Sequence, residues 1–346
     1  MRKGLRYELI RNTNELEQLT PEWNDLWEAD GHATPFQTPA WLVPWWHSFG
    51  AELRTIAIRR HDALVGLLPF YVYCEPRSGE RQLLPLGVGT TDYLDGVFSP
   101  QLSVDDVSGA LELLYAQDDW DALYVSQLRL ASKILEALEL SAPGGQRIET
   151  QSCSRMPAVP MGELPQKIRR NAMYYRNRAQ RAGHLELTIA DESNWPEAFD
   201  ALLRLHTERW RAHGDPGVFA DERVIRWHRE SLPVLERLGV LRLLTLRLDA
   251  EIIGVMYALL DPPGRTDRTE YFYLPGYSIA HADLRPGAVL IALATEYAAE
   301  EGVRTVDMLR GDEEYKKIWH MERTRTFGFV SYREKMRMTG EGVMAA

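Results

Sequence analysis

The sequence predicts a mixed α/β (α+β) fold of two similar halves, each a mixed, mostly antiparallel sheet flanked by helices. The chain of 346 residues has the length of two domains. The same order of strands and helices occurs twice along it. A short echo supports this repeat, because residues 62–66 and 249–254 both run from Asp-Ala to a glycine and both join one strand to the next. We expect domains at residues 1–160 and 161–346.

The first half alternates extended and helical patterns. Leu16, Leu19, Trp23 and Leu26 recur at helical spacing after Thr13, a residue suited to the N-cap. Turn sequences at 61–63 and 76–79 separate runs that are typical of strands. The predicted elements are a strand at 5–11, helices from 13 and at 39–49, strands at 53–60, 64–73 and 81–88, a helix at 103–116, a strand at 120–126, a helix at 132–140 and a strand at 147–154.

The second half begins with a predicted helix at 164–182, which Gly183 ends. Apolar residues recur along it at helical spacing and predict one buried face. The following elements repeat the order of the first half. They are a strand at 185–190, helices at 195–212 and 221–238, strands at 240–248, 252–260 and 269–274, a helix at 287–301, a strand at 303–308, a short helix at 315–320 and a strand at 326–333.

The helix at 164–182 carries a basic face. Six cations lie on it, namely Lys167, Arg169, Arg170, Arg176, Arg178 and Arg181. The nearest acid is Glu163, and the chain as a whole has a formal net charge of -10. A solvated face and an anion-binding surface are both compatible with this pattern.

Composition narrows the function classes. A net charge of -10 argues against binding nucleic acid over the whole surface. Cys74 and Cys153 have no metal or redox spacing, so we expect two buried small hydrophobes in a reducing compartment, and no metal. No apolar run reaches the roughly 18 residues of a membrane span, and the start lacks a signal-peptide pattern. We therefore expect a cytoplasmic protein.

Three tryptophans crowd one short predicted helix. Trp41, Trp45 and Trp46 lie within six residues of one another. They are compatible with an aromatic binding wall, but buried packing between domains is the more common use of such residues.

Several segments together resemble a known family. They are Phe36-Gln37-Thr38-Pro39-Ala40-Trp41, Ile168-Arg169-Arg170-Asn171, His206-Thr207-Glu208-Arg209-Trp210, Leu284-Arg285-Pro286-Gly287, and Asp307 to Asp312 with Tyr315-Lys316. In this order they resemble the GNAT acyltransferases of the BioF-two-like or CelD/BcsL type, which are related to Fem-type peptidyltransferases. The resemblance implies tandem GNAT-like folds, with acetyl or acyl transfer from acyl-CoA in the second half. The corresponding place in the first half, residues 99–102, has no glycine, so we expect the first half to be a scaffold or acceptor wall without a donor loop of its own.

A donor site is expected where the helix at 287–301 begins. The first turn of a helix leaves N–H groups for an anion, so Gly287, Ala288 and Val289 are predicted to bind the diphosphate with Arg285 as counter-charge. The family usually has a glycine pair here, and this chain has one glycine. By resemblance, Tyr273 on the preceding strand supplies a backbone N–H to the thioester.

The catalytic candidates are Tyr315, Asp312, Lys316 and His206. The resemblance makes Tyr315 the general acid. Asp312 and Lys316 are four residues apart, which on a helix gives either a local ion pair or a couple that orients the acceptor. His206 has an intrinsic pKa suited to a base near neutral pH, although a lone helical histidine is more often a packing residue.

Three functions remain open from the sequence. The first is acyl transfer from acyl-CoA to an amine or hydroxyl, by resemblance in polysaccharide or cell-envelope metabolism. The second keeps the fold but uses aminoacyl-tRNA as donor, bound by the basic helix. The third is a non-catalytic protein that binds a glycan or a synthase partner through the region of Trp41 to Trp46.

Overall fold

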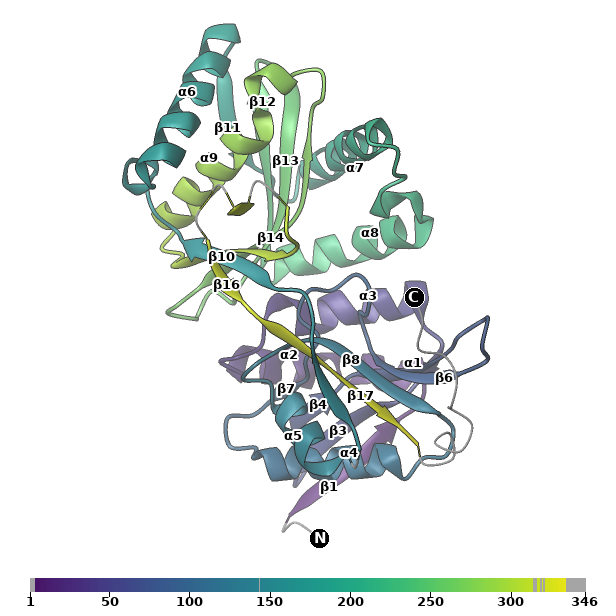
Figure 1. Cartoon of the computed structure of the whole chain (residues 1–346). Coiled ribbons are helices and arrows are strands. Elements are labelled where there is room, and N and C mark those ends of the chain that lie inside the picture. The colour runs from purple at the N-terminus through teal and green to yellow at the C-terminus, as the bar shows by residue number, and fades with distance from the viewer. Residues whose placement is uncertain (1–3, 143, 314–315, 318, 320, 334–346) are drawn as a thin grey trace. The chain divides into compact units, whose positions relative to one another are not determined.

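The computed structural model describes residues 4–142, 144–313, 316, 317, 319 and 321–333. The chain forms two compact units (Figure 1). Unit 1 comprises Met1–Gln151 and Arg325–Ala346, and unit 2 comprises Ser152–Thr324. Both are mixed α/β structures in which mostly antiparallel sheets are flanked by helices, which confirms the predicted fold class.

Unit 1 contains two sheets, with strand orders β1-β3-β4-β7 and β2-β5-β6-β8-β17-β9. Its strands are β1 Leu5–Ile10, β2 Glu52–Leu53, β3 Thr55–Arg60, β4 Ala63–Leu68, β5 Phe70–Cys74, β6 Arg81–Pro85, β7 Val97–Phe98, β8 Ala122–Arg129, β9 Gln146–Glu149 and β17 Thr326–Tyr332. Its helices are α1 Thr13–Gln18, α2 Thr20–Ala29, α3 Pro39–Phe49, α4 Val104–Tyr115 and α5 Lys133–Ser141, with a 3-10 turn η1 at Pro35–Gln37.

The tryptophans of α3 serve packing within unit 1. The indole N–H of Trp41 donates to Thr91 Oγ1, and that of Trp45 donates to Thr90 Oγ1. Both indoles are buried. Because buried indole N–H groups need partners, these bonds fix the helix against the loop that follows β6. This use does not match an aromatic wall that is open to a ligand.

The described residues of unit 2 form one sheet of seven strands in the order β11-β12-β13-β14-β15-β10-β16. Its strands are β10 Cys153–Pro157, β11 Leu185–Ile189, β12 Leu241–Leu248, β13 Glu251–Leu260, β14 Thr269–Tyr277, β15 Thr305–Arg310 and β16 Glu322–Thr324. Its helices are α6 Gln166–Ala182, α7 Trp195–Ala212, α8 Glu222–Arg237 and α9 Pro286–Glu300, with 3-10 turns η2 Met161–Glu163, η3 Val218–Ala220 and η4 Ala282–Leu284.

Helices cover both faces of the unit 2 sheet (Figure 1). On one face, α6 and α9 pack with the strands in a single apolar core that includes Ile168, Ala172, Leu290 and Phe272. On the other face, α7 packs against β13 and β14. Among the described residues, no helix combines the length and apolar character that a bilayer crossing requires.

The two units repeat one arrangement. Among the described residues of each unit, one parallel strand pair, β6 with β8 or β14 with β15, interrupts antiparallel pairing. The connection between the paired strands contains one long helix, α4 or α9. The echoed hairpins also match in conformation, because His61 and Asp249 both adopt left-handed φ values, 55° and 52°.

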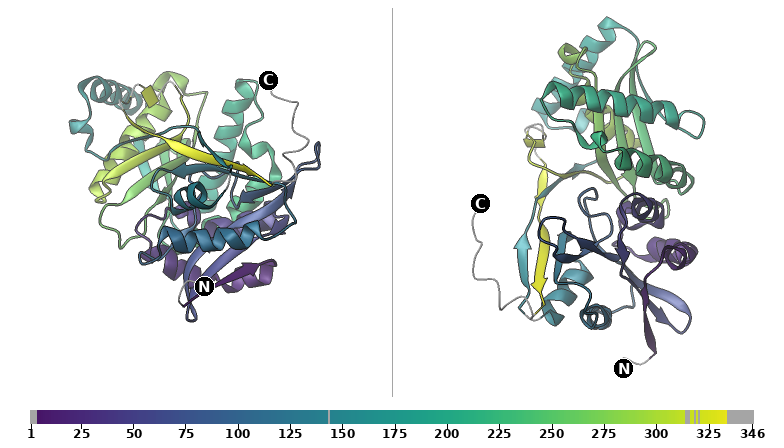
Figure 2. Two further views of the ribbon diagram at one scale, coloured as in Figure 1. Left: turned by 60° about the horizontal axis from the view of Figure 1, so that its bottom comes forward. Right: turned by 90° about the vertical axis from the view of Figure 1, so that its right-hand side faces the viewer.

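The chain exchanges strands between its units. β17 pairs with β8 and β9 in unit 1 although its sequence follows unit 2, and Figure 2 shows this yellow strand among the blue and purple elements of unit 1. β10 lies between β15 and β16 in unit 2. The sequence-based boundary at residue 160 assigns both strands to the other unit. Periodicity identifies a strand but does not identify its partner, because pairing is set by distant residues.

Other expectations also differ from the structure. The strands expected at 53–60 and 64–73 are each two strands, β2 with β3 and β4 with β5, in different sheets. The strand expected at 147–154 is two strands, β9 and β10, in different sheets. The helix expected from 164 begins at Gln166, because Pro165 occupies its N-cap. Cys153 is buried as expected, whereas Cys74 is exposed at the end of β5.

Candidate active site

Strands β14 and β15 are paired over a short stretch only. Their register covers three pairs, which are Thr269 with Thr305, Glu270 with Val306, and Tyr271 with Asp307. β14 continues to Tyr277 and β15 to Arg310. The sheet therefore opens between two neighbouring strands, and an extended ligand can use backbone groups along such an opening.

Asp307 and Leu309 give a local reason for the separation. Leu309 has a left-handed φ of 59°, a conformation that costs an L-residue roughly 1–2 kcal/mol and departs from the extended path of a strand. The Leu309 N–H donates to Asp307 Oδ1 at 2.7 Å, which helps to hold this conformation. Asp307 thus stabilises the departure of β15 from β14.

Tyr273 is a bulge residue on β14. The register passes from Tyr257 with Leu274 to Ala258 with Phe272, so Tyr273 has no directly opposed residue on β13. Its ring lies edge-on to Tyr257, with centroids 5.4 Å apart. Bulges are common beside active sites because they redirect the backbone and the side chain. The sequence-predicted Tyr273 therefore lies at an irregularity just past the end of the β14–β15 pairing.

Helix α9 begins without a side-chain cap. Arg285 precedes it in a left-handed conformation, φ 53° and ψ 52°, and Pro286 is its first residue. Its first turn contains no acidic residue. The N–H groups of Ala288 and Val289 both donate to the Arg285 carbonyl, at 3.0 and 3.2 Å. Of the three donors expected from the sequence, only the Gly287 N–H has no hydrogen-bond partner within the described residues.

Arg209 and Tyr277 lie beside this helix start. A Cβ atom added to Gly287 would lie 3.0 Å from the Tyr277 ring, so glycine allows close packing here. The Arg209 guanidinium lies over the same ring, 4.5 Å from the Tyr277 centroid. Neither Arg209 nor Arg285 has a carboxylate partner among the described residues. Two cations and one backbone N–H thus remain for an anion at the start of α9.

The equivalent helix of unit 1 begins differently. Ser103 caps α4 by accepting from the Asp106 N–H, and the Asp106 carboxylate accepts from the Ser103 N–H. Asp105 adds a second acid to the first turn. This reciprocal cap occupies the donors and repels anions. The start of α9 therefore suits a phosphate better than the start of α4.

His206 lies in a buried aromatic cluster. Its ring is 4.8 Å from Phe219 and 5.8 Å from Trp210, and the residue is 3% exposed. Burial, with a smaller effect from Arg209, lowers the pKa of His206 to about 4. The Nδ1 atom is buried and has no hydrogen-bond partner among the described residues. The imidazole is thus neutral at pH 7, as a proton acceptor must be, but it is a weaker base than an ordinary histidine.

His228 belongs to the same cluster and was not singled out from the sequence. It stacks on Trp227 at 4.1 Å and lies 5.7 Å from the Tyr273 ring. Burial lowers the pKa of His228 to about 3. The cluster therefore connects helix α8 to the bulge of β14 through neutral aromatic rings.

The segment after β15 contains the other catalytic candidates. Lys316 is 4% exposed, and its ammonium donates to the carbonyls of Leu309 and Arg310 and pairs with Glu313 at 2.9 Å. Asp312 pairs with Arg323 instead of Lys316. Among the described residues, Asp312 and Lys316 therefore form no ion pair with each other, and their role in orienting the acceptor stays a prediction. Tyr315, the predicted general acid, lies outside the described residues.

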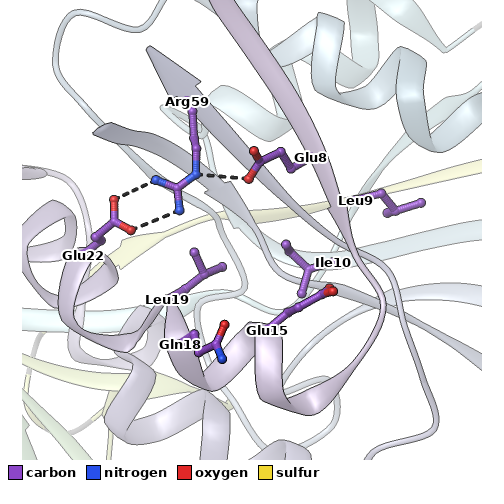
Figure 3. A pocket seen from close by; sticks show the side chains of 8 residues that line it. All are labelled: Glu8, Leu9, Ile10, Glu15, Gln18, Leu19, Glu22 and Arg59. Carbon is purple, nitrogen blue, oxygen red and sulfur yellow. Dashed lines mark hydrogen bonds and ion pairs between the residues drawn. The ribbon is translucent and has the colours of Figure 1, made fainter. Parts of the chain in front are cut away.

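A hollow of about 440 Å³ lies on unit 1, between β1, α1, α2 and β3 (Figure 3). Arg59 crosses it and pairs with Glu8 and Glu22. The hydrogen bond from Arg59 lowers the pKa of Glu22 and holds its carboxylate ionised. These ion pairs tie α2 to β1 and β3. None of the residues that line this hollow is one of the catalytic or donor-binding candidates expected from the sequence.

Residues 166–317 match the family model described as the acetyltransferase (GNAT) domain. This segment carries a GNAT-type domain. The matched segment runs from α6 past β15 to residue 317. It includes the opening between β14 and β15, the start of α9 and Lys316. The match covers less than half of the chain. No curated protein matches the sequence.

Several solved structures are similar to this chain in fold over both units. FemX aligns with 12% identity and a TM-score of 0.66, covering 96% of this chain and 99% of its own. The C-terminal domain of a putative lysylphosphatidylglycerol synthetase from Agrobacterium fabrum aligns with 11% identity and a TM-score of 0.59, covering 94% and 95%. L-PGS from Bacillus licheniformis aligns with 11% identity and a TM-score of 0.58, covering 92% of each chain. These likenesses concern the fold alone.

Proposed function

We propose that unit 2 transfers an acetyl or longer acyl group from acyl-CoA to an amine or hydroxyl acceptor. The observation that carries this proposal is the opening between β14 and β15 beside the uncapped start of α9. It lies within the segment that matches the GNAT model. Residues at this opening fit a donor with a thioester at one end and phosphate at the other.

The donor's phosphates are assigned to the start of α9. The Gly287 N–H, Arg285 and Arg209 supply one backbone donor and two guanidinium groups. Ala288 and Val289 hold the helical turn through their bonds to Arg285 and shape the site without donating to the ligand. The backbone at Tyr273 is assigned to the thioester carbonyl, where charge develops when a nucleophile attacks.

Proton transfer requires a base for the nucleophile and an acid for the leaving thiolate. We assign Tyr315 as the acid, which rests on the family resemblance. His206 is the candidate base, since burial keeps it neutral. Lys316 holds the carbonyls that end β15, so we assign it, with Asp312, to positioning that segment.

One active site per chain follows from the contrast between α9 and α4. The capped, acidic start of α4 gives unit 1 no comparable donor site. We therefore assign unit 1 a scaffold or acceptor-binding role. The acceptor class, in polysaccharide or cell-envelope metabolism, and a cytoplasmic location rest on the sequence-based expectations.

Thermal denaturation with acetyl-CoA and with CoA tests this function. We expect either ligand to raise the Tm of the wild type by mass action, and Arg285→Glu to reduce this rise. Arg237→Glu is the control, because Arg237 is exposed at the end of α8 and outside the proposed site. Each shift is measured against the same variant without ligand. No rise with any acyl-CoA at saturating concentration rejects the proposal.

Transfer from aminoacyl-tRNA is the second candidate function. The basic helix α6 is the observation that favours it, because it offers cations to a polyanion. Retention of charged tRNA that is lost when Arg169, Arg170 and Arg176 are reversed supports it. Indifference to tRNA rejects it.

A further inference from the structure

Helix α6 is a concentrated basic surface on an acidic protein. Residues 166–182 contain six cations and no acid, in a chain with a net charge of -10. Among the described residues, Arg178 is the only one of the six with a carboxylate partner, Asp283. The positive charge of α6 is therefore largely uncompensated, and it favours an anionic partner.

The cations and two exposed hydrophobics share the outer part of the helix. Ile168, Ala172 and Ala179 point into the core that α6 shares with α9. The opposite stripe, at intervals of three or four residues, consists of Lys167, Arg170, Tyr174, Arg178 and Arg181. Tyr174 is 54% exposed, and the neighbouring Met173 is 40% exposed. This surface thus has an apolar centre with cations on either side.

This surface adjoins the proposed donor site. Arg178 pairs with Asp283 at 2.9 Å, and Asp283 lies on η4, two residues before Arg285. Leu284 of the same turn is buried in the core with Ile168 and Val289. Figure 1 shows α6 on the same side of the sheet as α9. A partner docked on α6 would sit beside the start of the donor-binding helix.

We propose that α6 docks an acidic carrier protein that delivers the acyl group on a 4′-phosphopantetheine arm. The inference rests on the proposed acyltransfer, because the arm has the same thioester as coenzyme A. A carrier-linked arm ends in one phosphodiester, which matches the single backbone donor of Gly287. The acids of the carrier pair with the α6 cations, and its apolar surface covers Met173 and Tyr174.

A nucleic acid fits these observations less well. A nucleic acid needs several phosphate contacts along its backbone. Outside α6, however, this chain carries a more negative charge than the net -10 of the whole chain. The basic surface is one helix of 17 residues, which is the scale of a contact with a small protein. Solvent-exposed Met173 and Tyr174 at its centre favour a partner that has an apolar patch of its own.

The reaction is the same as with coenzyme A. The acceptor nitrogen or oxygen forms a bond to the thioester carbonyl carbon, and the carbon–sulfur bond breaks. The proton of the nucleophile is released to the base, and the pantetheine sulfur leaves as a thiol after protonation. No oxidant or further reactant is needed.

Binding of an acetyl-loaded type II acyl carrier protein to the full-length chain tests the inference. We expect binding that weakens with salt, and a loss of about tenfold or more in affinity for Arg170→Glu/Arg181→Glu. The same variant should keep the Tm rise with acetyl-CoA, which shows that it is folded and that its donor site is intact. Arg223→Glu/Arg237→Glu on α8 is the matched charge control.

Each other outcome is decisive. If acetyl-CoA raises the Tm but the carrier does not bind, the docking surface is rejected and the acyltransfer proposal stands. Equal carrier binding by the wild type and the α6 variant also rejects the docking surface. Binding of tRNA in place of the carrier assigns α6 to nucleic acid. If neither acetyl-CoA nor the carrier binds, both proposals fail.

Discussion

Gly287 allows a close contact at the proposed donor site. The position has an ordinary φ, and what demands glycine is the Tyr277 ring, 3.0 Å from where a Cβ would lie. The same ring carries the Arg209 guanidinium. A side chain at 287 would displace the ring and, with it, a cation of the proposed anion site.

We therefore predict that Gly287→Ala weakens acetyl-CoA binding about tenfold, which is about 1.4 kcal/mol. Isothermal titration calorimetry measures the change. Gly162→Ala is the control, because an added Cβ there meets nothing within 4 Å. An unchanged affinity for Gly287→Ala would remove Tyr277 and Arg209 from the site.

His228 links stability to pH. Burial lowers its pKa from 6.5 to about 3, so below pH 6.5 the unfolded chain binds a proton that the folded chain excludes. This contribution to stability is complete above pH 6.5 and is lost progressively as the pH falls toward 3. At pH 5 the loss amounts to about 2 kcal/mol.

His228→Phe is predicted to flatten this dependence. Urea unfolding at pH 7.5 and pH 5 should show a smaller difference for the variant than for the wild type. The comparison between variants cancels Glu270, whose pKa burial raises to about 7 and whose effect has the opposite sign. His213→Gln, at an exposed position, should behave like the wild type. If His228→Phe loses as much stability between pH 7.5 and pH 5 as the wild type does, His228 is not the source of this pH dependence.

At the scale of elements, the left-handed residue near the end of β15 separates it from β14. Unit 1 has a counterpart, since Gln127 on β8 has φ 56°. In both units the left-handed residue lies beyond the parallel pairs. The opening of the sheet is thus part of the repeated arrangement, whereas the helix between the paired strands begins differently in the two units.

Replacing Asp307 tests this account of the opening. Asp307→Ala removes the acceptor of the Leu309 N–H and should lower the free energy of unfolding by about 1–3 kcal/mol. Asp307→Asn keeps an acceptor oxygen and should lose less. Denaturant unfolding compares the wild type, Asp307→Asn and Asp307→Ala. The rise in Tm with acetyl-CoA should decrease in the same order, from the wild type to Asp307→Asn to Asp307→Ala. Equal stability of the alanine and asparagine variants would exclude this hydrogen bond as the cause.

The sequence predicted most elements but only part of the site. Helices were expected at residues 39–49 and 103–116, and α3 and α4 form there. The Gly287 position and the Tyr273 strand were also found, because turn chemistry and strand order are local. The sequence indicates Arg209 only as part of the segment 206–210, because no local pattern shows that its guanidinium lies over the Tyr277 ring.

At the scale of the whole molecule, the exchanged strands make each unit depend on a distant segment. β10 comes before all other strands of unit 2 in sequence but lies between β15 and β16. β17 comes last but lies between β8 and β9. Cutting the chain at residue 160 therefore removes an interior strand from the unit 2 sheet and from one sheet of unit 1.

We predict that residues 152–324 fold alone, whereas residues 161–346 do not. The first fragment keeps all seven strands of the unit 2 sheet, and the second lacks β10. Circular dichroism during urea unfolding distinguishes them, because only the first should show a cooperative transition. Equal cooperativity of the two fragments contradicts the structural role of β10.

The sequence by itself determined the type and order of most elements, the repeat and the basic face of α6, because these depend largely on neighbouring residues. Tertiary structure decided which sheet receives β10 and β17, the contact of Arg209 with Tyr277 near Gly287, and the lowered pKa values of His206 and His228. These features arise from strand pairing and burial, which bring together residues that are far apart in the sequence.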